Sequence, residues 1–152
     1  MRRRAKVYLD TSVVSALYDE VNPERRSLTE EFFETIPNYE PFVSEVTVAE
    51  IARTPDPALK RKLEGAVAGL TVLPLTDEAE SLAKEFIHAG AVPESHPEDA
   101  FHIAIAVLND MDFLLSWNFR HIVRRRTRDI VAMVGSSRML KRVELITPPE
   151  LL

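Results

Sequence analysis

A chain of 152 residues, 45% hydrophobic and 28% charged, has the size and composition of one globular domain, which we expect to cover residues 1–152. The absence of cysteine excludes disulfides and thiolate metal sites and fits a reducing cytoplasm. A formal net charge of -5 argues against a nucleic-acid partner if only the sum of the charges counts.

The apolar segments are too short for a membrane protein. The longest strongly apolar run covers residues 103–108, far fewer than the roughly 18 residues that span a bilayer. Behind the N-terminal arginines, Asp10 interrupts the apolar run that a signal peptide would need. We therefore expect a cytoplasmic protein with no membrane segment.

The predicted elements alternate between strands and helices along the chain. Apolar runs with β-branched or aromatic residues predict strands at residues 7–9, 42–43, 71–73, 113–115 and 143–146. Helical patterns lie between them: a short helix follows residue 43, three longer ones follow the capping residues Asn22, Asp56 and Thr76, and a capping box at residues 95–98 predicts one that ends near Asn109. Alternation without hairpin signals indicates a parallel sheet covered on both faces.

The charges are unevenly distributed along the chain. Residues 77–112 are acidic, with Lys84 as their one lysine or arginine, whereas residues 118–142 are basic, with Asp129 as their one acid. Two interpretations stay open. In the first, both segments are ordinary solvated helix faces. In the second, an acidic surface that holds metal ions adjoins a basic surface that binds a phosphate backbone.

Three acids occupy places where burial needs compensation. Asp10 ends the first predicted strand, Glu50 lies among apolar residues of the short helix, and Asp99 begins a helix that is apolar almost all round. An isolated buried carboxylate is costly unless it is paired, protonated or bound to metal. Pairing with arginine stays open for each acid. Hard oxygen ligands without cysteine or histidine favour Mg²⁺ or Mn²⁺.

Two other acids have local explanations. Glu45 lies in the first turn of its helix, where the helix dipole favours a negative charge. The predicted capping box gives Glu98 a structural task. His102, one turn after Asp99, is either a core histidine or a partner that orients the Asp99 carboxylate. Trp117 is interpreted as a packing residue beside the end of a strand.

Four segments together resemble the PIN-domain family and, within it, the VapC-like toxins of toxin-antitoxin pairs. They are YLDTSVVSALYD, VSEVTVAEI, EDAFHIAIA and LLSWNFRHI, and the resemblance spans nearly the whole chain. It implies a three-layer α/β/α sandwich with a central parallel sheet, a metal-dependent endoribonuclease that leaves a 5′-phosphate and a 3′-hydroxyl, and a small antitoxin protein as partner. We also expect a homodimer.

The resemblance also assigns residues. The family's first three acids fall on Asp10, Glu50 and Asp99, which would hold Mg²⁺ or Mn²⁺. The family's fourth acid is usually the last residue of a motif of threonine, any residue and aspartate. In this sequence Ser116 replaces the threonine and Asn118 the aspartate, and the uncharged Asn118 argues against a second metal ion. We expect Thr11, Ser12, His102 and Ser116 to support the site. The residues expected to contact RNA phosphates are Arg120, Arg124 and Arg125.

Two alternatives compete with a nuclease. A phosphatase that uses Asp10 as nucleophile would need a second aspartate two residues on, where the sequence has Ser12. A non-catalytic module could keep the fold to bind RNA or protein, with Asn118 as the mark of a degenerate site. Retention of three costly acids favours the nuclease over that module.

Overall fold

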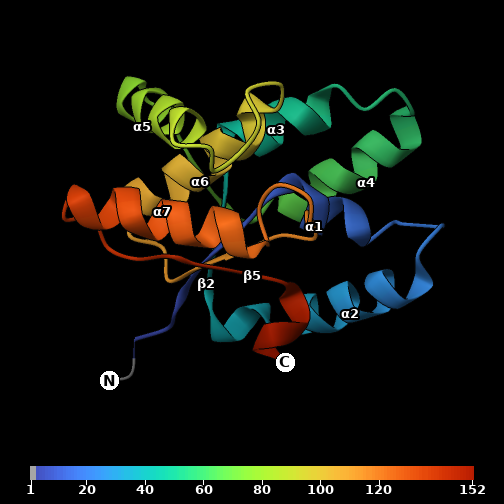
Figure 1. Ribbon diagram of the computed structural model, residues 1–152. Helices are drawn as coiled ribbons and strands as arrows, with labels where there is room; N and C mark the ends of the chain where they lie inside the picture. The colour runs from blue at the N-terminus through green and yellow to red at the C-terminus, as the bar shows by residue number, and fades with distance from the viewer. Residues whose placement is uncertain (1–2) are drawn as a thin grey trace.

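The computed structural model describes residues 3–152 and has a five-stranded parallel sheet at its centre (Figure 1). The strands are Lys6–Leu9 (β1), Glu40–Ser44 (β2), Thr71–Leu73 (β3), Phe113–Leu115 (β4) and Glu144–Ile146 (β5), in the order β3-β2-β1-β4-β5. Because β1 is the central strand, it pairs on both sides: Tyr8 lies opposite Phe42 of β2 and Leu114 of β4. All five predicted strands are confirmed.

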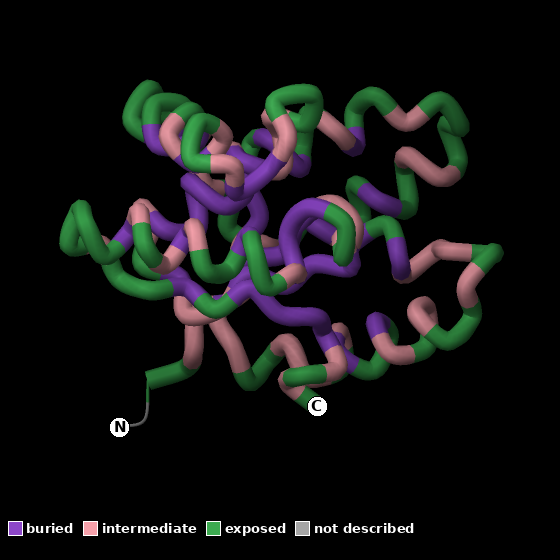
Figure 2. Tube along the Cα trace, in the orientation of Figure 1, coloured by how far each residue is buried: buried purple, intermediate pink, exposed green. Residues whose placement is uncertain are grey.

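Helices cover both faces of the sheet. The α-helices are Thr11–Ala16 (α1), Pro23–Glu34 (α2), Glu45–Ala52 (α3), Pro57–Val67 (α4), Asp77–His88 (α5), Pro97–Leu108 (α6) and Arg125–Ser137 (α7), and Ile36–Asn38 (η1) and Pro148–Leu151 (η2) are 3₁₀ turns. One core joins the sheet to α5, α6 and α7, and a second joins it to α1, α2 and α4. The predicted three-layer α/β/α sandwich is therefore confirmed, and Figure 2 shows the buried chain running through its middle.

The strand β1 shows how the sequence creates two cores. Side chains alternate between the faces of a strand. Val7 and Leu9 pack in the core with α1, α2 and α4, while Tyr8 packs in the core with α5, α6 and α7. All three side chains are fully buried, as expected for a parallel strand covered on both faces.

Three of the four predicted helix caps are confirmed, and the fourth is wrong. The side chains of Asn22, Asp56 and Thr76 accept hydrogen bonds from backbone amides of α2, α4 and α5. The capping box at residues 95–98 does not form, because α6 begins with Pro97 at its first position and His96 as its N-cap. Proline suits that position and disfavours a helical backbone at the preceding residue, His96 (φ -128°, ψ 63°), which moves the helix start past Ser95.

Asp112 joins the start of β1 to the loop before β4. Its carboxylate accepts hydrogen bonds from the Lys6 backbone N–H (2.8 Å), Lys141 Nζ (2.7 Å) and Arg3 Nη2 (2.8 Å). Partial burial works against the charged carboxylate, but these donors outweigh it and lower the pKa of Asp112 to about 2. The carboxylate is therefore ionised at every pH at which the protein would normally be studied.

Asp112→Asn is expected to lower the melting temperature at neutral pH. Because the folded-state pKa lies below the ordinary value of 3.8, the stabilisation is complete above 3.8 and is lost as the pH falls towards about 2. Thermal unfolding followed by circular dichroism should show the two melting temperatures converging over that interval. Asp110→Asn removes the same charge two residues away and should show no such convergence.

No helix within residues 3–152 is long and apolar enough to cross a membrane.

Candidate active site

The candidate site lies at the carboxyl ends of the central strands. Asp10 directly follows β1, Ser44 ends β2, and Ser116 directly follows β4. The Asp10 backbone N–H donates to the Leu115 carbonyl (3.2 Å), which ties the ends of β1 and β4 together. Ligands of parallel α/β sheets bind at this edge, and a change in the direction of strand order occurs beside β1.

Asp10 is a helix cap and a buried acid at the same time. Its Oδ1 accepts from the Val13 backbone N–H (3.2 Å), which caps α1, and from Ser12 Oγ (2.6 Å). Only 3% of the residue is exposed, and burial raises the pKa of the carboxyl despite these hydrogen bonds. Capping alone does not require a charge, because asparagine and serine cap equally well.

Glu50 is held by two donors from different elements. Its Oε1 accepts from Thr11 Oγ1 (2.8 Å) and is 2.7 Å from His102 Nε2. The other ring nitrogen of His102 is 2.5 Å from the Tyr8 hydroxyl, which is 2.7 Å from Ser44 Oγ. Desolvation opposes the charged form of Glu50, but His102 and Thr11 outweigh it, so the pKa of Glu50 lies below its ordinary value.

Asp99 is connected to the loop after β4 by a contact with His121. Its Oδ2 is 2.9 Å from His121 Nδ1, and the His121 backbone N–H donates to Asn118 Oδ1 (2.9 Å). The Asn118 backbone N–H donates in turn to Ser116 Oγ (2.9 Å). The loop after β4 therefore positions His121, and His121 positions the Asp99 carboxylate.

The three acids belong to one chain of contacts, here named the acidic network. Thr11, adjacent to Asp10, contacts Glu50. Ser12 contacts Asp10 and accepts from the Trp117 backbone N–H (2.9 Å), next to Asn118 in the loop that holds Asp99 through His121. The members of the acidic network are Tyr8, Asp10, Thr11, Ser12, Ser44, Glu50, Asp99, His102, Ser116, Asn118 and His121.

The donor chemistry of the acidic network fits a hard divalent cation. Within residues 3–152 no donor contacts Glu50 Oε2 or Asp99 Oδ1, and the bonds that Asp10 accepts from Ser12 and Val13 fall on its Oδ1, while Ser116 also interacts with the Asp10 carboxylate. Carboxylate oxygens are the ligands that Mg²⁺ and Mn²⁺ prefer. In the described part of the chain, however, no three acids or histidines lie close enough together to hold an ion as they stand. Binding would require the carboxylates to turn towards one another.

Two histidines lie differently from the sequence interpretation. A contact between His102 and Asp99 does not form: His102 contacts Glu50, because it is buried between β1 and α3 while Asp99 faces the loop after β4. His121 is a member of the site that the sequence does not indicate. Its 22-residue separation from Asp99 gives no local signal, although an asparagine three residues before a capped amide is a recognisable turn motif.

Most of the basic segment stabilises the fold. Arg124 donates to Thr127 Oγ1 (2.7 Å) and to the Ala91 carbonyl (3.0 Å). Other bases of the segment contact protein groups as well: Arg126 with Gly90, Arg128 with Leu145, Arg138 with Glu85, and Lys141 with Asp112. Arg120 and Arg125 are exposed, and Arg125 has only a distant partner in Asp129 (3.7 Å).

Comparison with known families decides the classification. The family model of the PIN domain matches residues 7–123, which run from β1 through β4 and include all three acids of the network. The chain belongs to the PIN-domain family. No curated protein sequence matches the chain.

Solved structures of a VapC toxin and of two VapBC proteins share the fold. VapC20 of Mycobacterium tuberculosis, a sarcin-ricin loop cleaving toxin, is 16% identical with a TM-score of 0.61, over 76% of this chain and 92% of that chain. VapBC2 from Rickettsia felis, bound to a promoter DNA fragment, is 11% identical with a TM-score of 0.56, over 92% of this chain and 96% of that chain. VapBC-5 of M. tuberculosis is 19% identical with a TM-score of 0.51, over 94% of this chain and 98% of that chain. At these identities the likeness establishes the fold alone.

Proposed function

We propose that this PIN-domain protein is a divalent-metal-dependent endoribonuclease and the toxin of a toxin-antitoxin pair. The observation that carries the proposal is the acidic network, in which three carboxylates lie at the carboxyl edge of the sheet and two of them, Glu50 and Asp99, each keep one oxygen without a donor from residues 3–152. Buried or half-buried acids are costly, and this arrangement gives them a use in chemistry.

Asp10, Glu50 and Asp99 would hold Mg²⁺, or Mn²⁺ in its place. When bound, the ion supplies a Lewis acid that polarises a phosphodiester oxygen and lowers the pKa of an attacking water. Thr11 and His102 fix the orientation of Glu50, and His121 does the same for Asp99. Hydrolysis would break the bond from phosphorus to the 3′ oxygen, leaving a 5′-phosphate and a 3′-hydroxyl.

Ser12 and Asn118 would position the water and the ligands. The Ser12 hydroxyl donates to Asp10 Oδ1 and so fixes the orientation of the carboxylate that would hold the ion. Asn118 has its Oδ1 engaged by the His121 backbone N–H, so its role is to hold the loop that carries His121. The exposed Arg120 and Arg125 would contact RNA phosphates, whereas Arg124 is held within the protein.

The partner and the assembly are part of the proposal. Two of the similar structures are VapBC proteins, and one of them is a member of the VapBC family of toxin-antitoxin systems. We therefore propose a small antitoxin protein as partner and a homodimeric toxin in the cytoplasm. A short adjacent reading frame that encodes a protein which co-purifies with this chain would support the pairing, and a stable, non-toxic solitary protein would contradict it.

The test of activity incubates the purified protein with a panel of structured RNAs in Mg²⁺, in Mn²⁺ and in EDTA. We expect site-specific cleavage with either ion, none in EDTA, and none by Glu50→Gln. Glu45→Gln, an acid of the same helix outside the acidic network, is the matched control and should cleave normally. Cleavage that persists in EDTA and in Glu50→Gln would remove the proposed site.

A second candidate is a PIN-like module that binds RNA or protein without cutting. The uncharged Asn118 at the position of the fourth family acid is the observation that favours it. Tight RNA binding by the wild-type protein with no cleavage of any RNA in either ion would support this candidate over the nuclease.

A further inference from the structure

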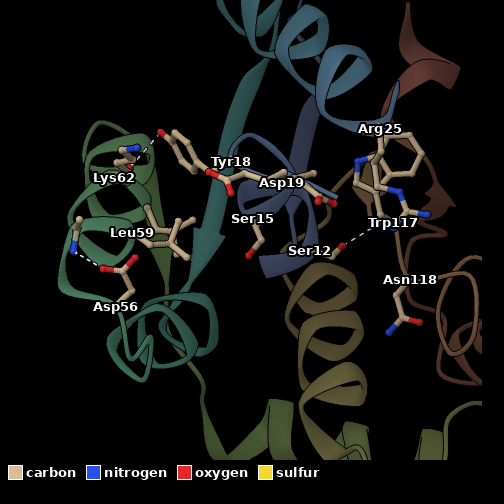
Figure 3. A pocket seen from close by; sticks show the side chains of 14 residues that line it. Ser12, Ser15, Tyr18, Asp19, Arg25, Asp56, Leu59, Lys62, Trp117 and Asn118 are labelled. Atoms are coloured by element: carbon tan, nitrogen blue, oxygen red, sulfur yellow. Dashed lines mark hydrogen bonds between the residues drawn. The ribbon is translucent and has the colours of Figure 1, made fainter. Parts of the chain in front are cut away.

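A pocket of about 690 Å³ opens beside the acidic network (Figure 3). Ser12 and Asn118 of the network line one side of it, and residues of α1, α2 and α4, of the segment after α1 and of the loop after β4 line the rest. The three acids proposed to hold the ion are not among its lining residues. The pocket is therefore a neighbouring space that a chain bound at the acidic network would enter.

An aromatic and cationic cluster stands where the pocket meets the loop after β4. The Arg25 guanidinium of α2 lies 5.0 Å from the ring centroid of Trp117 and 5.8 Å from that of Phe119. The centroids of the two rings are 6.3 Å apart, and their planes are inclined at 62°. Figure 3 shows Arg25 and Trp117 together, on the side of the pocket next to Asn118.

The three members of this cluster differ in what they can still bind. Trp117 is buried, and its Nε1 donates to Thr29 Oγ1 (2.8 Å), as expected of a packing residue. Phe119 is 51% exposed, although it is among the largest apolar side chains. Within residues 3–152 the Arg25 guanidinium has no hydrogen bond or ion pair that meets ordinary distance limits. The exposed ring of Phe119, the residue after Asn118, thus lies beside the Arg25 guanidinium, which keeps its N–H groups available to a ligand.

We propose that Phe119 and Arg25 form a subsite for one unpaired nucleobase of the RNA and its phosphate. The inference rests on the proposed function, because it is the acidic network next to the subsite that makes RNA the expected ligand. Unpaired bases stack on exposed aromatic rings and on guanidinium planes, and arginine pairs with phosphate through its N–H groups. Trp117 supports Arg25 from behind and does not itself stack with the base.

The charged residues that line the pocket bear on where in the pocket the phosphate would bind. Asp19 and Asp56 also line the pocket, but each is engaged: Asp19 accepts from the Val21 and Asn22 backbone N–H groups, and Asp56 from that of Ala58. Lys62 of α4 also lines the pocket, but Asp56 caps the same helix, whereas Arg25 stands next to Asn118 of the acidic network. The Arg25 end is therefore the end at which we place the phosphate.

The sequence supplies its own probe for this subsite. Trp117 is the sole tryptophan, and its ring contacts Arg25 and neighbours Phe119, so its emission reports on both. Short single-stranded RNAs, one of each base and one of mixed sequence, are titrated into the protein in EDTA so that binding is measured without cleavage. Tryptophan emission and the anisotropy of labelled RNA are read together. We expect RNA to change the emission as it binds.

Phe119→Leu keeps an apolar side chain and removes the aromatic face. It is expected to weaken single-stranded RNA binding by about 5- to 100-fold, while Phe119→Tyr binds like the wild type. Met133→Ala, which truncates another exposed apolar residue (61% exposed) on α7, is the control and should leave binding unchanged. Thermal melts of the four proteins should coincide, since neither site is buried.

Arg25→Met keeps the stem and removes the charge. If Arg25 contacts one phosphate, the slope of log affinity against log salt should become shallower by about 0.7 for a single strand. An unchanged slope, or equal RNA affinity of Phe119→Leu and wild type, would overturn the subsite. So would selective loss of binding to a co-purifying protein partner with RNA affinity intact, because the surface would then belong to that partner.

The two proposals can fail separately. If Phe119→Leu and Arg25→Met weaken RNA binding while the wild type never cleaves RNA in Mg²⁺ or Mn²⁺, the subsite stands and the nuclease does not. If the wild type cleaves RNA and both variants bind and cleave it normally, the nuclease stands and the subsite falls.

Discussion

Asp10→Asn is expected to abolish RNA cleavage and to raise the melting temperature of the ion-free protein. Loss of residues that merely orient a metal ligand costs about 10- to 100-fold in activity, so loss of a ligand charge should exceed that range. The amide oxygen of asparagine can still accept from Ser12 and from the Val13 backbone N–H, so the α1 cap is retained. Only the buried charge is removed.

The stability change should depend on pH in a defined direction. Burial raises the pKa of Asp10 in the folded state above its ordinary value of 3.8, so the folded protein holds this proton more tightly than the unfolded chain does. Stability therefore falls as the pH rises from about 3.8 to the folded-state pKa, and the loss is complete above it. The variant has no such proton. Its advantage in melting temperature should be absent below pH 3.8 and largest at neutral pH.

Adding Mg²⁺ provides a readout that is independent of cleavage. An ion that binds only the folded state stabilises it by mass action, by about 2.7 kcal/mol when its concentration is about 100 times its dissociation constant. The melting temperature of the wild type should rise with Mg²⁺, and that of Asp10→Asn should stay nearly constant. A variant that melts below the wild type at neutral pH without ions would mean that the Asp10 carboxylate stabilises the fold, which would remove the argument that it is kept for chemistry.

Residues whose role follows from their immediate neighbours could be predicted from the sequence. Asp10 stands at the end of an apolar run, and Glu50 and Asp99 stand in helices that are mainly apolar. Each of these places is visible within a few residues. The strands were predictable for the same reason, because alternation of apolar segments and caps is local. The helix start at Pro97 was missed where two local rules competed, and the proline outweighed the capping box.

The contacts that organise the acidic network could not be predicted in this way. His102 lies 52 residues from Glu50 and 94 from Tyr8, and their contacts exist only because β1, α3 and α6 pack together. A histidine in an apolar helix signals that it must have a partner but not which partner. The same limit applies to the basic segment, where the sequence does not distinguish an arginine held by a backbone carbonyl, such as Arg124, from an exposed one.

Asn118→Ala is expected to reduce cleavage by about 10- to 100-fold, the range for residues that orient metal ligands. The change removes the oxygen that accepts from the His121 backbone N–H and leaves the Asn118 backbone bond to Ser116 intact. His121 would then hold Asp99 less firmly, so a higher Mg²⁺ concentration should be needed for half-maximal cleavage. Initial rates measured over a range of Mg²⁺ concentrations separate this shift from a loss of maximal rate.

Asn118→Asp should act in the opposite direction, because it restores an acceptor in the same place and adds a negative charge at the edge where an ion would bind. We expect cleavage to be retained and half-maximal activity to occur at lower Mg²⁺. Equal activity of Asn118→Ala and wild type would contradict any role for this residue in the site. If instead Asn118→Ala raises and Asn118→Asp lowers the Mg²⁺ concentration needed for half-maximal cleavage, then Asn118 is a positioning residue in a working site. Its lack of charge is then no sign of decay.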